Sequence, residues 1–226
     1  MRAHPSTYRP GYVAMPTLIR KTFSVPPLGC NCSILGDPVT KQAIVVDPGG
    51  AHEHILHEVR QLGLAVTYIV HTHAHFDHFL ASGEMKKATG ATLCLHPDDL
   101  VLWKMLEMQC RMFGVPYVSV PLPDHWLNDE EKLCVGEIEA IALHTPGHTP
   151  GSLSLHMPAE HLVLAGDTLF RGSIGRTDLW GGDFDAIEQS IRERLYNLGD
   201  TTIVVTGHGP ETAIGLEKET NQFVRV

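Results

Sequence analysis

The sequence lacks a long hydrophobic run, and positive charge is scarce in it. No apolar stretch approaches the roughly 18 residues that a membrane-spanning helix needs, so we expect no membrane association. The 226 residues carry 17 lysines and arginines against 26 aspartates and glutamates, for a formal net charge of −9. Nucleic-acid binding needs clustered basic side chains, and no such cluster occurs. The composition therefore argues against membrane proteins and nucleic-acid-binding proteins.

Cysteines are also few: five, an odd number, scattered along the chain. Cys30 and Cys32 are too close for a comfortable disulfide, and no second pair completes a zinc knuckle. We therefore expect reduced, mostly buried thiols. Residues 1–16 have no apolar core of a signal peptide and are expected to form a loose arm. Together these features favour a cytoplasmic protein, without indicating its oligomeric state.

Two motifs of common enzyme classes are missing. No glycine-rich phosphate loop follows the first predicted strand, which excludes a P-loop or dinucleotide-binding reading. No G-x-S-x-G segment is present, which argues against a serine hydrolase. What remains is an ordinary globular composition, 43% hydrophobic and 19% charged. No repeat or polar linker divides residues 17–226, so we predict one domain there.

Hydrophobic periodicity predicts mixed α and β structure of the α/β (α+β) class. Strands are expected at 22–35, 42–46, 66–70, 92–95, 137–144, 152–157, 161–165 and 203–206. Helices are expected at 55–62, 83–89, 98–112 and 184–198, the last with a capping start at Asp185. Hairpin-like strands with isolated helices favour layered sheets covered by helices.

Histidine is abundant, with fifteen residues, and four metal-ligand side chains fall within six positions of one segment. That segment is Thr72-His73-Ala74-His75-Phe76-Asp77-His78, directly after a predicted buried strand. His73 and His75 alternate in extended chain, so both side chains can reach one ion. A change of conformation after them would turn Asp77 and His78 toward a second ion. Imidazole and carboxylate ligands suit zinc, iron or manganese.

Three further ligand-type residues also follow predicted strands. They are His148 in Thr145-Pro146-Gly147-His148-Thr149-Pro150-Gly151, Asp167 in Gly166-Asp167-Thr168-Leu169-Phe170, and His208 in Gly207-His208-Gly209-Pro210. Each alone is most simply a cap or a surface group. Together they predict one site where the strand ends gather.

These motifs, in this order and spacing, resemble the metallo-β-lactamase superfamily from about residue 17 onward. The resemblance implies a four-layer αββα sandwich with the metal site at one edge of the two sheets. It implies that His73, His75 and His148 bind one divalent ion, that Asp77, His78 and His208 bind another, and that Asp167 bridges them. Zinc is the expected metal, with iron or manganese as alternatives. The position of Asp47 in the family's D-P-G implies that it supports the ligand loops.

Within the superfamily, the chain is similar to short glyoxalase II-like (hydroxyacylglutathione hydrolase-like) hydrolases. The supporting segments are 166–170, 173–176 and 207–221. This likeness implies hydrolysis of an acyl-thiol such as S-lactoylglutathione by a metal-bridging hydroxide, with Asp77, His73, His75, His148 and Asp167 as the catalytic set. Arg176 is expected to bind substrate, or alternatively to form a salt bridge with a loop acid.

Other interpretations remain open. Gly175-Arg176-Thr177-Asp178 is shared with persulfide dioxygenase-like proteins, which use a single iron, whereas Gly207-His208-Gly209-Pro210 is not. A lactonase or β-lactamase on the same scaffold, and a binding module without activity, are further alternatives. For Met105, Met108, Met112 and Phe113 we expect core packing rather than an acyl or thiol pocket. His71, His96, His125, His144 and His156 are assigned to packing or surface.

Overall fold

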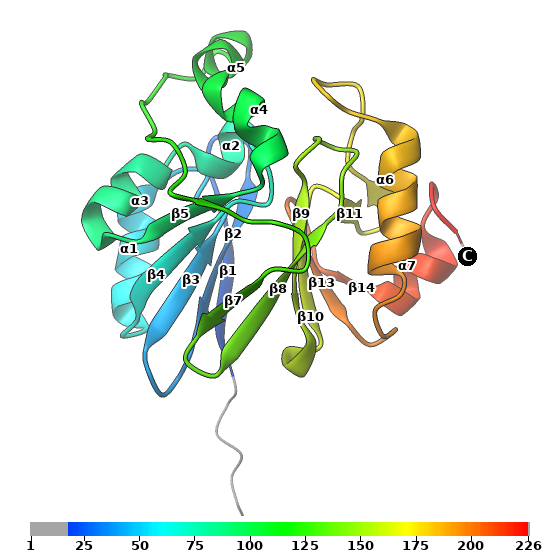
Figure 1. The fold of residues 1–226 in the computed structure, drawn as a ribbon, viewed down its shortest axis with the longest axis horizontal. Helices are drawn as coiled ribbons and strands as arrows, with labels where there is room; N and C mark the ends of the chain where they lie inside the picture. The colour runs from blue at the N-terminus through cyan, green and yellow to red at the C-terminus, as the bar shows by residue number, and fades with distance from the viewer. Residues whose placement is uncertain (1–17, 226) are drawn as a thin grey trace, which may run out of the picture.

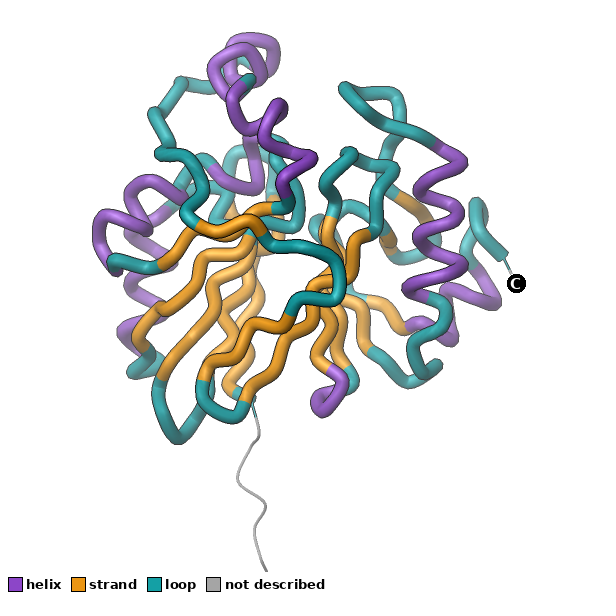
Figure 2. The backbone as a smooth tube through the Cα atoms, viewed as in Figure 1, coloured by secondary structure: helices purple, strands orange, loops and turns teal. Residues whose placement is uncertain are grey.

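The computed structural model describes residues 18–225, so the arm expected over residues 1–16 lies outside the described residues. Two six-stranded sheets pack face to face, and helices cover their outer faces (Figures 1 and 2). The strand order is β1-β2-β3-β4-β5-β6 in the first sheet and β14-β13-β10-β9-β8-β7 in the second. This arrangement confirms the predicted αββα sandwich.

The first sheet and its helices comprise β1 (Ile19–Val25), β2 (Cys30–Gly36), β3 (Gln42–Val46), α1 (His52–Gln61), β4 (Ala65–Val70), α2 (Phe76–Phe79), α3 (Ser82–Thr89), β5 (Thr92–Leu95), a 3-10 turn (Pro97–Asp99), α4 (Leu100–Lys104), α5 (Leu106–Phe113) and β6 (His125–Trp126). The second comprises β7 (Lys132–Val135), β8 (Ile138–His144), β9 (Leu153–Met157), a 3-10 turn (Pro158–Glu160), β10 (Leu162–Gly166), α6 (Phe184–Ser190), a π-helical turn (Ile191–Leu195), β13 (Ile203–Thr206), β14 (Thr212–Ala213) and α7 (Ile214–Thr220). A small ladder of β11 (Leu169–Phe170) and β12 (Ser173–Ile174) follows β10.

Three clusters of buried apolar side chains fill the spaces between the four layers. Strand β3 contributes to two of them: Ala43 and Val45 pack toward the helices, whereas Ile44 and Val46 pack toward the second sheet. A strand buried on both faces is apolar without a break, because successive side chains point to opposite faces. On the far side, Ile187 and neighbouring apolar side chains fill the space between the second sheet and its helices. Within residues 18–225 no helix is long and apolar enough to span a membrane.

The prediction of one strand over 22–35 was wrong. Residues 26–29, Pro-Pro-Leu-Gly, form a turn between β1 and β2, with Val25 paired opposite Cys30. Proline has no N–H for a ladder, and Gly29 adopts a φ of +80°, so the chain reverses here instead of continuing. The predicted turn after Leu35 is present, and the Asp37 side chain accepts bonds from the N–H groups of Val39 and Thr40.

Two predicted helices also differ from the structure. The helix expected over 98–112 is divided at Met105 into α4 and α5, and the carbonyl of Leu102 accepts from both the Met105 N–H and the Gln109 amide. The helix expected over 184–198 begins at Phe184, but its cap is Asp183, which accepts from the N–H of Ala186. Its second half is a π-helical turn ending at Leu195.

Candidate metal centre

The segment after β4 provides four of the predicted ligands. His73 and His75 precede α2, and His75 is its N-cap residue with extended backbone angles (φ −83°, ψ 140°). The single helical turn that follows places Asp77 and His78 on α2, where both are buried. The predicted change of conformation between the two ligand pairs is therefore present.

The other three ligands come from the second sheet. His148 lies in the loop between β8 and β9, Asp167 directly follows β10, and His208 follows β13. The N–H of Leu153 in β9 donates to the carbonyl of Thr72, which joins this edge to the segment after β4. The structure thus brings all seven predicted residues to one edge of the sandwich.

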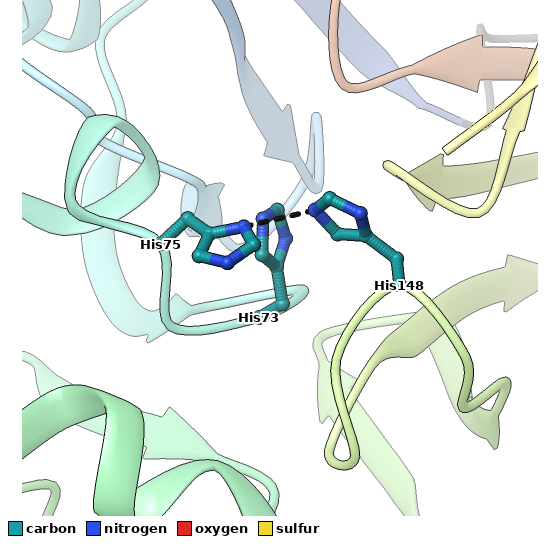
Figure 3. Close-up of side chains that lie close together, drawn as sticks. All are labelled: His73, His75 and His148. Atoms are coloured by element: carbon teal, nitrogen blue, oxygen red, sulfur yellow. Dashed lines mark hydrogen bonds between the residues drawn. The ribbon is translucent and has the colours of Figure 1, made fainter. Parts of the chain in front are cut away.

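Three imidazoles form the first ligand set, shown in Figure 3. The ring centroids of His73, His75 and His148 lie 4.6–4.8 Å apart, and the ring planes are nearly perpendicular. His75 Nδ1 and His148 Nε2 are 2.9 Å apart. Nitrogen ligands about 2.1 Å from one tetrahedral zinc ion are separated by about 3.4 Å, so the two nitrogens are close enough to share an ion.

Asp77, His78 and His208 form the second set. His208 Nε2 lies 3.2 Å from Asp77 Oδ2 and 3.2 Å from His78 Nε2. Asp167 stands between the sets: its Oδ2 is 3.5 Å from His148 Nε2, and its Oδ1 is 3.5 Å from His78 Nε2. A carboxylate in this position has one oxygen available for each of two neighbouring ions.

Unpartnered buried atoms test whether these residues fit metal ions. In the part of the chain that the structure describes, four buried side-chain nitrogen or oxygen atoms have no hydrogen-bond partner, and three belong to this cluster: His73 Nε2, His75 Nε2 and Asp167 Oδ1. Buried polar atoms are normally paired, so a concentration of unpaired ones indicates a missing partner. Metal ions at this site would bind His73 Nε2 and Asp167 Oδ1.

Burial also sets the protonation states that such ligands need. It lowers the pKa of His75 to about 3, with a further contribution from nearby His148, and it lowers the pKa of His73 well below the usual value. Burial alone would raise the pKa of Asp77, but the imidazoles of His78 and His208 bring it down to about 2. Neutral imidazoles at His73 and His75 and an ionised Asp77, the forms that bind metals, are therefore favoured at neutral pH. At His78 and His208 burial lowers the pKa, but neighbouring groups such as Asp77 and Asp167 raise it by a larger amount, so these two rings would release a proton on binding a metal.

Asp47 orients one ligand and the loop beneath it. Its Oδ2 lies 3.0 Å from His78 Nδ1 and accepts from the Thr72 hydroxyl, while Oδ1 accepts from the Thr72 N–H. On the other side, His148 Nδ1 donates to the carbonyl of Arg176 at 2.8 Å. Each bond leaves the opposite ring nitrogen, Nε2, available as a ligand.

Asp99, which no sequence motif singled out, joins the two ligand loops. It lies in the 3-10 turn after β5, is fully buried, and accepts from the N–H groups of Ala74 and Gly151 and from the Thr149 hydroxyl. Burial raises the pKa of Asp99. Gln109 was also missed; its amide bonds the backbone of Ala74 and Phe76. Both residues lie inside the helix predicted over 98–112. The only sequence feature that could have indicated their role is a polar side chain at a position of that helix that is buried.

Glycines allow the backbone to pack against the ligands. A side chain on Gly49 would reach 1.7 Å from the carbonyl oxygen of Asp77, and one on Gly175 would reach 1.8 Å from that of Asp167. Neither distance is physically possible without moving the ligand-bearing chain. These two positions therefore accept only glycine.

A cavity of about 170 Å³ opens in front of the cluster. It is lined by five of the candidate ligands together with Leu28, Phe76, Gln109, Phe113, Arg176 and Leu179. The expectation of core packing holds for Met105, but Met108 and Met112 are exposed, and Phe113 lines the cavity. The five histidines assigned to packing or surface lie outside the two ligand sets.

The side chain of Arg176 is at the cavity wall but is already paired. Its Nε and Nη2 atoms donate to the two carboxylate oxygens of Asp178 at 2.7 and 2.8 Å. This is the loop salt bridge that the sequence left as an alternative to substrate binding. The hydrogen bonds from Arg176 lower the pKa of Asp178 to about 2, so the pair stays ionised at neutral pH.

The fold and these ligand sets define a metallohydrolase-type domain, and the family model described as the metallo-beta-lactamase superfamily matches residues 25–208. The chain belongs to this superfamily, whose members bind divalent metals. It is 37% identical to hydroxyacylglutathione hydrolase GloC from Haemophilus influenzae over 196 residues, which cover 86% of this chain and 92% of that protein.

Solved structures agree with this assignment. BLEG-1 B3 metallo-beta-lactamase superposes with a TM-score of 0.83 at 35% identity, covering 91% of this chain and 99% of that one. TTHA1623 in a di-iron-bound form gives 0.84 at 36% identity, covering 90% and 100%. ETHE1 from Myxococcus xanthus gives 0.76 at 27% identity, covering 90% and 83%.

Proposed function

We propose that the protein is a two-metal hydrolase that cleaves small-molecule thioesters. The observation that carries this proposal is the position of Asp167, whose two oxygens each lie 3.5 Å from a ligand nitrogen of a different set. A site for a single ion would not need the second set of Asp77, His78 and His208. Zinc is the metal we expect, and the di-iron form of TTHA1623 supports iron as an alternative.

Metal ions bound here would supply a nucleophilic water at neutral pH and an electrophile for the acyl oxygen. The chain itself holds the ligands in place. Asp47 and the Arg176 carbonyl fix the rings of His78 and His148, and Asp99 keeps the two ligand loops together.

The leaving group follows from the lining of the cavity. Among its described residues, the ionisable side chains are candidate metal ligands or, for Arg176, already paired with Asp178. No side chain is therefore free to protonate a leaving group. A thiol has a pKa near 8.5 and leaves readily as a thiolate, whereas an amine or alkoxide needs a proton. The similarity to hydroxyacylglutathione hydrolase GloC supports the same bond type.

The experiment is hydrolysis of a panel of thioesters, β-lactams and lactones by the protein purified without chelator. We expect thioester turnover that a chelator abolishes and that added zinc, iron or manganese restores. Asp167→Asn should reduce it by at least about 100-fold, whereas His161→Asn, an exposed position whose φ of +49° asparagine tolerates, should not. Turnover of β-lactams or lactones without thioesters would overturn the proposal.

A persulfide dioxygenase is the second candidate, favoured by the likeness to ETHE1 and by the shared segment Gly175-Arg176-Thr177-Asp178. Against it stands His208, whose Nε2 lies within 3.2 Å of two other ligand atoms. Oxygen consumption with glutathione persulfide by protein containing one iron, without thioester hydrolysis, would establish this alternative.

A further inference from the structure

The cavity in front of the ligand cluster has an apolar wall assembled from three separate segments. Leu28 comes from the β1–β2 turn, Phe113 is the last residue of α5, and Leu179 lies in the loop after β12. Leu28 is 53% exposed and Phe113 is 39% exposed, so both side chains are accessible to a ligand. Three apolar side chains that line one cavity beside a reactive centre indicate a ligand with an apolar part.

The wall is held in position rather than loosely placed. The Phe113 ring packs on the ring of Phe76, with centroids 4.9 Å apart, and Phe76 is buried. Gln109, one turn before Phe113 on α5, accepts from the N–H of Phe76 and donates to the carbonyl of Ala74. A preformed apolar surface loses little conformational entropy when a ligand covers it.

The charged side chains of the cavity also favour an uncharged ligand. Arg176 is the one lysine or arginine among the described residues that line the cavity, and its Nε and Nη2 atoms both donate to Asp178. The other charged groups of the lining, Asp77 and Asp167, are carboxylates. A substrate carboxylate on the thiol side, away from metal ions bound at the ligand sets, would meet no lysine and only an arginine that is already paired.

We propose that this pocket accepts thioesters that carry an apolar acyl chain on an uncharged thiol, with Leu28, Phe113 and Leu179 in contact with the substrate. This inference rests on the proposed thioester hydrolysis and names its substrate class. In the reaction, the oxygen of water bonds to the acyl carbon as the carbon–sulfur bond breaks. The two protons of water are shared between solvent and the departing thiolate, and the products are a carboxylate and a thiol without any redox change.

The test compares four substrates: lactoyl and hexanoyl groups, each on glutathione and on N-acetylcysteamine. We expect kcat/KM to be at least about tenfold higher for hexanoyl than for lactoyl on the same thiol, because added methylenes gain contact with an apolar wall. On the same acyl group, we expect N-acetylcysteamine to be preferred over glutathione. A preference for lactoylglutathione would overturn this inference while supporting thioester hydrolysis. If the protein hydrolyses none of the four substrates, the proposed thioester hydrolysis itself is wrong.

A pair of variants tests the wall directly. Leu28→Ser should lower the ratio of hexanoyl to acetyl kcat/KM on N-acetylcysteamine by about five- to tenfold. Val39→Ser is the matched control, because Val39 is also an exposed apolar residue, at 71%, in the turn between β2 and β3. That variant should leave the ratio unchanged. An equal loss for both acyl groups in Leu28→Ser would indicate a structural role and contradict the assignment.

Discussion

The Nδ1 atom of His75 lies 2.9 Å from the Nε2 atom of His148, although the two residues stand on loops of different sheets. His75 belongs to the segment after β4, and His148 lies between β8 and β9. Burial keeps His75 neutral by lowering its pKa to about 3. Two ring nitrogens from opposite halves of the sandwich are thus held at a separation that suits ligands of one ion.

Asp99→Asn should destabilise the protein by about 2 kcal/mol or more, because an amide NH₂ would face N–H or O–H donors that now bond to a carboxylate oxygen. Denaturant unfolding of the variant measures this loss. Asp98→Asn is the matched control, since the Asp98 side chain is 58% exposed, and it should change stability by less than about 0.5 kcal/mol. Equal stabilities of the two variants would show that Asp99 does not join the loops.

Asp47→Asn should weaken metal binding about 10- to 100-fold without altering the backbone. The φ of Asp47 is +51°, a left-handed conformation that asparagine also adopts, while the bond to His78 Nδ1 loses its charge. Competition with a chromophoric chelator gives the affinity. Asp185→Asn, an exposed position in α6, serves as the control, and an affinity unchanged in Asp47→Asn would contradict the supporting role.

The contribution of His71 to the stability of the metal-free protein should be lost as the pH falls from 7 to 5. Burial lowers the pKa of His71 to about 4 from a usual value near 6.5, against the opposing hydrogen bond to the Cys94 carbonyl. The unfolded chain then binds more protons than the native one between these values, so acid favours unfolding. His71 alone contributes about 2 kcal/mol of this loss by pH 5.

Denaturant midpoints measured at several pH values test this prediction. His71→Gln should be less stable at pH 7 but should lose less stability on acidification. His54→Gln, with a half-exposed side chain (51%), should follow the wild-type curve. A His71→Gln variant that loses as much stability as the wild type between pH 7 and pH 5 would contradict the assignment.

Asp178→Asn should raise the kcat/KM for glutathione thioesters relative to the corresponding N-acetylcysteamine thioesters. The substitution removes the charge that now pairs with Arg176, so the guanidinium becomes available to a substrate carboxylate. The Arg176 carbonyl that accepts from His148 belongs to the backbone and is retained. An unchanged ratio of the two thiols would show that Arg176 cannot reach the substrate.

Much of the site was predictable because its residues follow apolar strands directly. His73, Asp167 and His208 each lie just beyond a strand, and the carboxyl ends of such strands meet at one edge. The strand at 42–46 was likewise predicted, and its unbroken apolar run from Ala43 to Val46 is what burial on both faces requires. These signals are local, so a single sequence contains them.

Residues whose role depends on distant partners were not predictable. Asp99 bonds Gly151, 52 positions away, and nothing near Asp99 in the sequence indicates that contact. Gln109 is a similar case, because its amide donates to the carbonyl of Ala74, 35 positions away. Phe113 was assigned to the core because an amphipathic helix does not reveal whether its apolar face meets the interior or a cavity.

The central claim is that seven side chains hold two metal ions, and elemental analysis of metal per chain tests it most directly. We expect about two ions per chain in protein purified without chelator, about one in His208→Asn, and about two in the exposed control His161→Asn. One ion in the wild type, unchanged by His208→Asn, would contradict a two-metal centre.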